Sequence, residues 1–133
     1  MRSSDPASLA AVDASIQKAI DAAVVEENKR WGTAQTITVV KELIGDRPAG
    51  NTPENSAIVR AGLGAATALG FNANLGEGST DSNLFMSVKI PAITIGGGGR
   101  GRNSHALNES FDPADAWMGT QHALLLTLAM VQK

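Results

Sequence analysis

The chain has 133 residues, and its 11 Lys and Arg against 13 Asp and Glu give a formal net charge of −2. This length is typical of a single domain, and the near-neutral charge argues against nucleic-acid binding and a polybasic membrane anchor, which need a basic surface. The absence of cysteine excludes disulfides, thiolate zinc sites and cysteine nucleophiles.

No long apolar segment stands out. The longest apolar run is residues 123–131, interrupted by Thr127, and it is much shorter than the ~20 residues that span a bilayer. The first residues lack the apolar stretch of a signal peptide. We therefore expect a cytoplasmic protein that binds neither membrane nor nucleic acid.

The first predicted element is an amphipathic helix from Pro6 to Gly32. Asp5 is a plausible N-cap, Pro6 suits the first helical position, and Gly32 is a typical stop. The apolar positions recur every three or four residues and are Leu9, Val12, Ile16, Ile20, Ala23, Val24 and Trp31. We expect this stripe to pack against another element.

Next comes a predicted strand at residues 36–44, which is β-branched and roughly alternating. Residues 45–51 contain Gly, Asp and Pro and form the best candidate for a domain boundary or hinge. Thr52 and Pro53 then favour a helix that continues to about Leu69.

The following stretch alternates between short strands and a short helix. Residues 71–75 form a weak candidate strand, and residues 76–80 form a loop. Asp81 could cap a helix that ends near Met86, and residues 90–95 read as a short apolar strand.

The last predicted elements are a glycine-rich loop and a helix. The loop covers residues 96–104, and Asp112-Pro113 opens the helix. Because residues 123–131 are nearly all apolar, we expect this helix to be buried on more than one side. The alternation of helices and strands predicts a layered α/β fold.

The glycine run from Gly96 to Gly101 suggests a phosphate-binding loop. Such a loop leads directly into a helix and usually carries a Lys and a Ser or Thr. Here the next helix starts only near Asp112, and no Gly-Lys-Ser/Thr follows. A flexible loop after a strand is the better interpretation.

Four side chains are candidates for chemistry, each with a plainer alternative. His105 follows the predicted strand at the edge where α/β sheets bind ligands, although a loop histidine is more often a surface residue than a ligand. His122 reads as a packing or surface residue. Asp81 reads as a helix cap. Arg47 is either a solvated loop residue or a carboxylate-binding group, since arginine binds carboxylates with two parallel hydrogen bonds.

Four segments taken in order resemble a known enzyme family. They are Gly-Asp-Arg-Pro-Ala-Gly at 45–50, Gly-Ser-Thr-Asp-Ser-Asn at 78–83, Lys-Ile-Pro-Ala-Ile-Thr-Ile-Gly at 89–96 and Ser-His-Ala-Leu-Asn-Glu-Ser at 104–110. Together with the helix ending at Leu69-Gly70, they are similar to the C-terminal part of the di-zinc exopeptidases that include aminoacylase, carboxypeptidase G and the bacterial tripeptidases. The resemblance covers residue 36 onward.

The resemblance implies a role for several residues. His105 would be a zinc ligand, and Glu109 would support its loop. Arg47 would bind the substrate carboxylate, and Asp81 would orient the neighbouring loop. The residues of that loop near the substrate would be Gly78, Ser79 and Thr80.

The resemblance also implies a layered helix–sheet–helix fold and a division of the chain. Residues 1–46 would be the remnant of a lid domain, which is often the dimerising one, and residues 47–133 the C-terminal part of the catalytic domain. The activity would be hydrolysis of an amide bond next to a carboxylate by a metal-activated water. Substrates would be small peptides or acyl-amino acids, and the protein would form homo-oligomers.

The chain departs from the family in its metal ligands. Family members hold two zinc ions with an earlier His-x-Asp, a bridging Asp and a Glu-Glu pair that supplies the general base. The histidines here are His105 and His122, whereas a catalytic zinc needs three protein ligands. We therefore assign no catalytic residue and expect the isolated chain to be inactive.

Two alternatives belong to other functional classes. One is a non-catalytic dimerisation or interaction module from a truncated peptidase gene. The other, more distant, is a small nucleotide-binding α/β domain.

Overall fold

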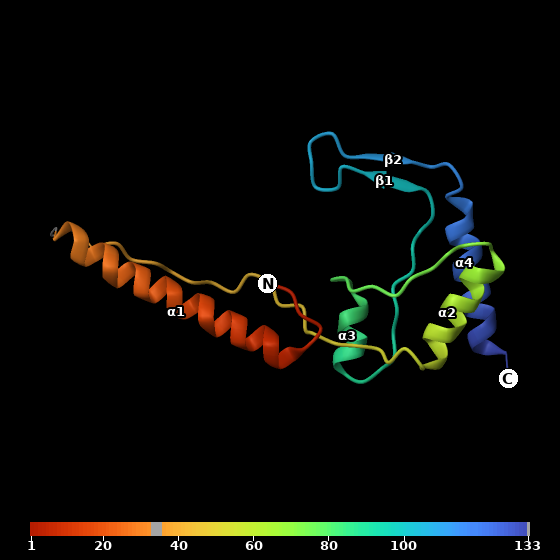
Figure 1. The fold of residues 1–133 in the computed structure, drawn as a ribbon, viewed down its shortest axis with the longest axis horizontal. Coiled ribbons are helices and arrows are strands. Elements are labelled where there is room, and N and C mark those ends of the chain that lie inside the picture. The colour runs from red at the N-terminus through yellow and green to blue at the C-terminus, as the bar shows by residue number, and fades with distance from the viewer. Residues whose placement is uncertain (33–35, 133) are drawn as a thin grey trace.

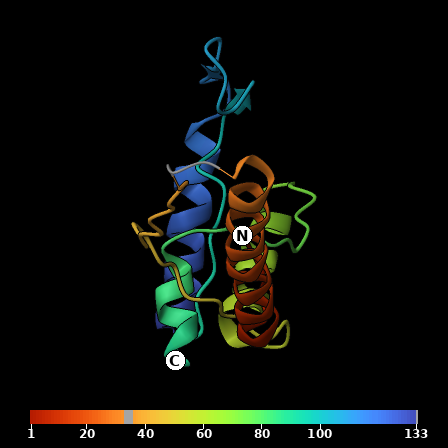
Figure 2. The same ribbon diagram turned by 90° about the vertical axis from the view of Figure 1, so that its left-hand side faces the viewer.

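The computed structural model describes residues 1–32 and 36–132, which form a mixed helix–strand protein with four helices and a two-stranded antiparallel sheet. The elements in chain order are α1 (Pro6–Trp31), α2 (Ala57–Ala68), α3 (Ser82–Ser87), β1 (Arg100–Arg102), β2 (Ser110–Asp112) and α4 (Trp117–Val131). In Figure 1, α1 projects to one side of a body that contains α2, α3 and α4. Figure 2 shows the β1–β2 hairpin extending beyond the helices.

Helix α1 confirms the predicted first element. The Asp5 side chain accepts hydrogen bonds from the backbone N–H groups of Ala7 and Ser8, at 3.2 and 2.9 Å. Gly32 ends the helix with a left-handed φ of 50°, a conformation that glycine adopts without steric cost. The apolar stripe packs only in part, because no residue of α1 from Pro6 to Trp31 is fully buried.

The face of α1 that is partly covered lies along the segment 36–45, which runs back beside the helix (Figure 1). The side-chain amide of Asn28 donates to the carbonyl of Ile37 at 3.0 Å and accepts from its N–H at 2.7 Å. Lys41 pairs with Asp21 at 2.6 Å. These contacts attach the segment to α1 by side chains rather than by a strand ladder.

The strands predicted at 36–44, 71–75 and 90–95 do not form among the described residues, where the sheet consists of β1 and β2. A strand depends on ladder hydrogen bonds to a neighbouring strand, and in the part of the chain that is described no strand pairs with these segments. Val40 and Ile44 remain 91% and 93% exposed. The apolar side chains that suggested a strand at 36–44 are therefore left uncovered in the described residues.

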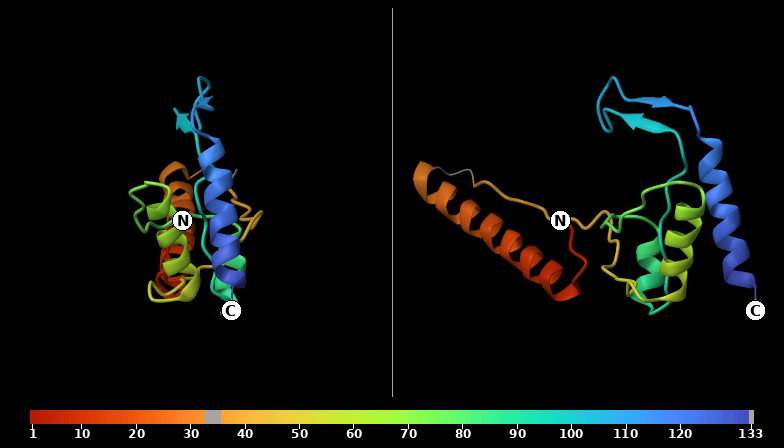
Figure 3. Two further views of the ribbon diagram at one scale, coloured as in Figure 1. Left: turned by 90° about the vertical axis from the view of Figure 1, so that its right-hand side faces the viewer. Right: turned by 45° about the vertical axis from the view of Figure 1, so that its right-hand side comes forward.

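The small core lies where α2 packs on α4 (Figure 3). Val59, Ala65 and Ala66 of α2 are buried. The Nε2 atom of the buried His122 lies 2.9 Å from the carbonyl oxygen of Gly62, and its ring contacts Phe71 with centroids 6.2 Å apart. This geometry confirms the packing interpretation of His122.

The start of α2 differs from the prediction. The helix begins at Ala57, after a turn closed by a hydrogen bond from the Ser56 N–H to the Pro53 carbonyl. Thr52 instead binds the segment 90–95, because its hydroxyl donates to the Ala92 carbonyl at 2.6 Å and accepts from the Ala92 N–H at 3.0 Å. These bonds hold residue 52 outside the helix.

The glycine-rich segment packs against α4 instead of forming a free loop. A Cβ atom at Gly119 would collide with the backbone of Gly97, and a Cβ at Gly98 would collide with that of Ala116. Gly98 also has a φ of 81°. Gly98 and Gly119 therefore permit close approach of two backbones, which accounts for these two glycines without any phosphate.

After this contact the chain forms the β1–β2 hairpin, although the sequence predicted a loop at residues 96–104. Strand β1 pairs with β2 in a register that sets Arg100 opposite Asp112, so opposite charges face each other across the strands. Because β2 ends at Asp112, helix α4 begins at Trp117 rather than at Asp112-Pro113.

Helix α4 also corrects an expectation about burial. Of its residues Trp117–Val131, all of them described, Gly119 and His122 are buried, whereas Leu124, Leu128 and Val131 are exposed. The reason is that α2 packs on one face alone. Among the residues described, no helix has both the length and the apolar character to cross a membrane.

Candidate functional site

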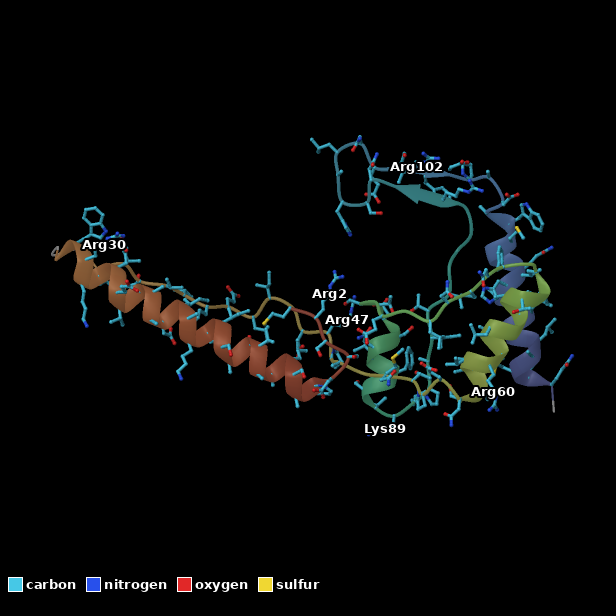
Figure 4. The ribbon with its side chains drawn as sticks, in the orientation of Figure 1. Arg2, Arg30, Arg47, Arg60, Lys89 and Arg102 are labelled. Carbon is cyan, nitrogen blue, oxygen red and sulfur yellow. The ribbon has the colours of Figure 1, made fainter. Side chains whose placement is uncertain are left out.

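The candidate site consists of Arg47 and the residues to which its side chain is hydrogen-bonded. Its Nη1 donates to the carbonyl and to the hydroxyl of Ser79, at 3.0 and 3.1 Å, and its Nη2 donates to Asp81 Oδ1 at 3.2 Å. Pro48 favours an extended conformation for Arg47, which projects its side chain from the chain (Figure 4). Two predicted segments more than thirty residues apart are thus joined through one guanidinium.

Asp81 occupies the N-cap position of α3, as predicted, but its side chain does not act as a cap. Its side chain makes no capping hydrogen bond, and its φ and ψ of −66° and −16° are already helical. The carboxylate is instead paired with Arg47, with exposed fractions of 90% for Asp81 and 44% for Arg47. Among the contacts described, this pairing falls to Asp81 and not to the adjacent Asp46.

The guanidinium keeps donors for a ligand. Arginine has five N–H donors in one plane, and the three bonds described come from Nη1 and Nη2. Within the described residues, the Nε–H and a second Nη2 hydrogen have no acceptor. A carboxylate can bind such a planar group through two parallel hydrogen bonds.

The loop that carries Ser79 is fixed from both sides. Asn83 Oδ1 accepts from the Thr80 N–H at 3.0 Å, and Asn83 Nδ2 donates to the Pro48 carbonyl at 3.2 Å. The Thr94 hydroxyl lies 2.6 Å from that of Thr80 and 2.8 Å from that of Ser82. The guanidinium is therefore bound to a loop whose conformation is held by its own hydrogen bonds.

Sequence reasoning assigned no role to Thr94, Ser82 or Asn83. The signal for Ser82 and Asn83 was present, because both belong to the Gly-Ser-Thr-Asp-Ser-Asn segment. Thr94 belongs to the 89–96 segment of the same resemblance, but its contact with Thr80 depends on how segment 90–95 passes the loop.

The site opens into a concavity of about 1650 Å³ that Arg47, Gly78 and Ser79 help to line. The N-terminal residues cover part of it, and Ser4 donates a hydrogen bond to Glu77 at 2.9 Å. The charged residues of the lining are the bases Arg2 and Arg47 and the acids Asp13, Asp46, Glu54 and Glu77. Acidic side chains thus outnumber basic ones in the lining of the concavity.

His105 and Glu109 lie away from this concavity, in the turn between β1 and β2. Glu109 Oε2 accepts from the backbone N–H of His105 at 3.4 Å, and His105 has a left-handed φ of 66°. The structure therefore brings these two residues together but does not bring them to Arg47. Across residues 1–32 and 36–132, no three His, Asp or Glu side chains form a group that could hold a metal ion.

Comparison with known proteins adds no assignment: no protein-family model matches the chain, and no curated protein matches it. The function proposed below therefore rests on the four sequence segments described above and on the hydrogen bonds of Arg47.

Proposed function

We propose that this chain is the C-terminal segment of a zinc-dependent exopeptidase or amidohydrolase that hydrolyses an amide bond next to a substrate carboxylate. The observation that supports this proposal is the hydrogen bonding of Arg47 to Ser79 and Asp81. It joins two of the segments that resemble the aminoacylase and carboxypeptidase G family.

In this proposal Arg47 binds the carboxylate. The guanidinium is held by a neutral loop carbonyl and hydroxyl, and it keeps an open Nε–H. A carboxylate seated there would fix the position of the adjacent amide bond, because the two groups are joined by one or two atoms in a peptide or an acyl-amino acid. Gly78, Ser79 and Thr80 would form the wall beside it.

The proposed division places residues 1–46 in a lid unit and residues 47–133 in the catalytic domain. Its support is the arrangement in Figure 1, where α1 and the segment 36–45 project together from the body. Arg47 is the first residue after this unit. In the complete enzyme, unpaired segments such as 90–95 would join a sheet between helical layers.

Zinc would supply a polarised water for hydrolysis when bound. His105 is the residue proposed to hold it, and the described residues do not themselves form a three-ligand group. The remaining ligands and the general base would come from polypeptide outside this sequence. We accordingly expect no peptidase activity from the chain alone.

A second candidate function is a non-catalytic dimerisation or interaction module. The observation that favours it is the segment 36–45, which lies along α1 with Val40 and Ile44 exposed. An exposed β-branched segment can pair with another chain in the way that an edge strand does.

The test of the carboxylate-binding role is an NMR titration of the full chain with N-acetylglycine and with its uncharged amide, at constant ionic strength. We expect the acid to shift the signals of Arg47 and of residues 79–81, and the amide to leave them unchanged. The Arg47→Ala variant should lose the response to the acid.

Arg60→Ala is the matched control, because Arg60 is an exposed arginine of α2 whose Nη1 bonds the Asn55 carbonyl at 2.9 Å. It should retain the response. An equal response to acid and amide, or a response that persists in Arg47→Ala, would refute the role proposed for Arg47.

A further inference from the structure

We propose that Asp81 is a resident counter-anion of Arg47, with which a ligand carboxylate must compete, and that it favours ligands with a single negative charge. This inference rests on the carboxylate-binding role proposed for Arg47. It assigns to Asp81 a function in selectivity, distinct from a helix cap or a support of the loop.

The first support is the position of the Asp81 carboxylate. Its Oδ1 accepts from Nη2 at 3.2 Å, which is the kind of contact that a ligand carboxylate would make with the same nitrogen. The second hydrogen of Nη2 and the Nε–H are open to a ligand, so the resident carboxylate and the ligand share the nitrogen Nη2 and compete for the charge of one guanidinium.

The second support is that Asp81 is held weakly. Its side chain is 90% exposed, and it makes no bond to the N-terminus of α3. Exposed ion pairs contribute little stability because water screens the charges. A ligand can consequently displace this carboxylate without disturbing the helix.

Ser79 shows why Arg47 stays oriented when Asp81 moves away. The carbonyl and hydroxyl of Ser79 both accept from Nη1, at 3.0 and 3.1 Å. Neither group carries a charge, so neither competes electrostatically with an anionic ligand. Ser79 thus positions the Arg47 guanidinium, and Asp81 competes with the ligand for it.

The charges that line the concavity affect which anionic ligands can bind. The lining acids Asp13, Asp46, Glu54 and Glu77 outnumber the lining bases Arg2 and Arg47. Asp81 neutralises Arg47 further. A second negative charge on the ligand would meet repulsion between like charges, so a monoanion is preferred.

The experiment compares the full chain with its Asp81→Asn variant, titrated by NMR with N-acetylglycine and with the dianion N-acetylaspartate at constant ionic strength. Asn keeps the size of the side chain and removes its charge. We expect Asp81→Asn to bind N-acetylglycine about two- to fivefold more tightly, the range of an exposed ion pair, and N-acetylaspartate to gain by a larger factor.

Asp21→Asn is the control, because it also removes one exposed ion pair, with Lys41, and one negative charge. It should leave both affinities unchanged. Asp81→Ser serves as a second variant, because serine removes the charge and is favoured at helix N-termini.

The outcomes separate the two proposals. If the unaltered chain binds neither acid, the role of Arg47 fails and the inference fails with it. If the chain binds through Arg47 but Asp81→Asn and Asp81→Ser bind equally or more weakly, Asp81 does not compete, and this inference alone is overturned. An equal gain in Asp21→Asn would also overturn it, because net charge would then be the cause.

Discussion

The guanidinium of Arg47 shows how one side chain can serve a site without stabilising the fold. Its ion pair with Asp81 is largely exposed, and pairs of this kind contribute about 0–1 kcal/mol. Its other hydrogen bonds join it to an exposed loop residue. Folding and ligand binding should therefore respond differently when it is removed.

We expect Arg47→Ala to change the free energy of unfolding of this chain by no more than about 1 kcal/mol, measured by urea denaturation. In the complete enzyme proposed above, kcat/KM for substrates with a free carboxylate should fall by the equivalent of about 2–5 kcal/mol, because one partner of a charge-assisted pair is lost. Amidated substrates should lose much less. Equal losses on acid and amide substrates would assign Arg47 a structural role.

At this scale the sequence identified the residues better than their contacts. Arg47 is a candidate from its residue type and its position between glycines and before Pro48, whereas Ser79 is a candidate through the family resemblance. The partner of Arg47 could not be derived, because Asp46 is adjacent while Asp81 lies 34 residues away. Local propensity also favoured Asp81 as a cap, and the long-range ion pair prevailed over it.

Helices and strands differ in how far the sequence predicts them. The bounds of α1 follow from Asp5, Pro6 and Gly32, since every one of its backbone bonds is made within the segment. A strand at 36–44 depends on a neighbour that its own residues cannot specify. For the same reason the β1–β2 hairpin, formed from a polar and glycine-rich stretch, was predicted as a loop.

Acid should weaken the N-terminus of α1. Hydrogen bonds from the Ser8 side chain, the Ser8 N–H and the Ala7 N–H lower the pKa of Asp5 below its usual value of 3.8. A lowered pKa means that this stabilisation is present above the unfolded pKa and is lost as the pH falls through the folded one. Helical circular dichroism should accordingly decrease in the range below about pH 4.

Asp5→Asn is the comparison for this effect, because asparagine caps a helix about as well without titrating there. The variant should show a smaller loss of helical signal over the same pH range. Identical acid curves for the two proteins would contradict a capping contribution from the ionised Asp5.

Two glycine substitutions should separate close packing from helix propensity. Gly119→Ala in α4 should destabilise the protein by about 1–3 kcal/mol, because the added methyl collides with the Gly97 backbone. Gly64→Ala in α2 meets no atom within 4 Å, so it should stabilise by about 0.5–1 kcal/mol. Thermal unfolding of both variants measures the difference, and a neutral Gly119→Ala would argue against this contact between α4 and the glycine-rich segment.

The whole molecule leaves much apolar surface uncovered. Exposed apolar side chains lie on α1, on the segment 36–45, on α3 and on α4, among them Val25, Val40, Phe85 and Leu124. Monomers rarely expose contiguous apolar patches beyond a few hundred Å². The mixed helix–strand character expected from the sequence is thus present, while in the described residues the sheet consists of β1 and β2 and does not join the helices into layers.

We therefore expect the isolated chain to self-associate. Light scattering after size exclusion should give a mass of at least twice 13.7 kDa at micromolar concentration. Double substitution of Val40 and Ile44 by Lys should shift the mass toward the monomer if the segment 36–45 contributes. A monomer across a wide dilution range would contradict the expectation.

The attachment of α1 has a mechanical consequence. The helix has 26 residues, so at a rise of 1.5 Å per residue it is about 39 Å long, and Arg47 lines the same concavity as its first turn. If α1 swung as a rigid lever about that end, a rotation of about 10° would displace Trp31 by about 7 Å. A small displacement at that end would then be amplified at the opposite end of the helix, where the exposed indole of Trp31 offers a fluorescent reporter of the motion.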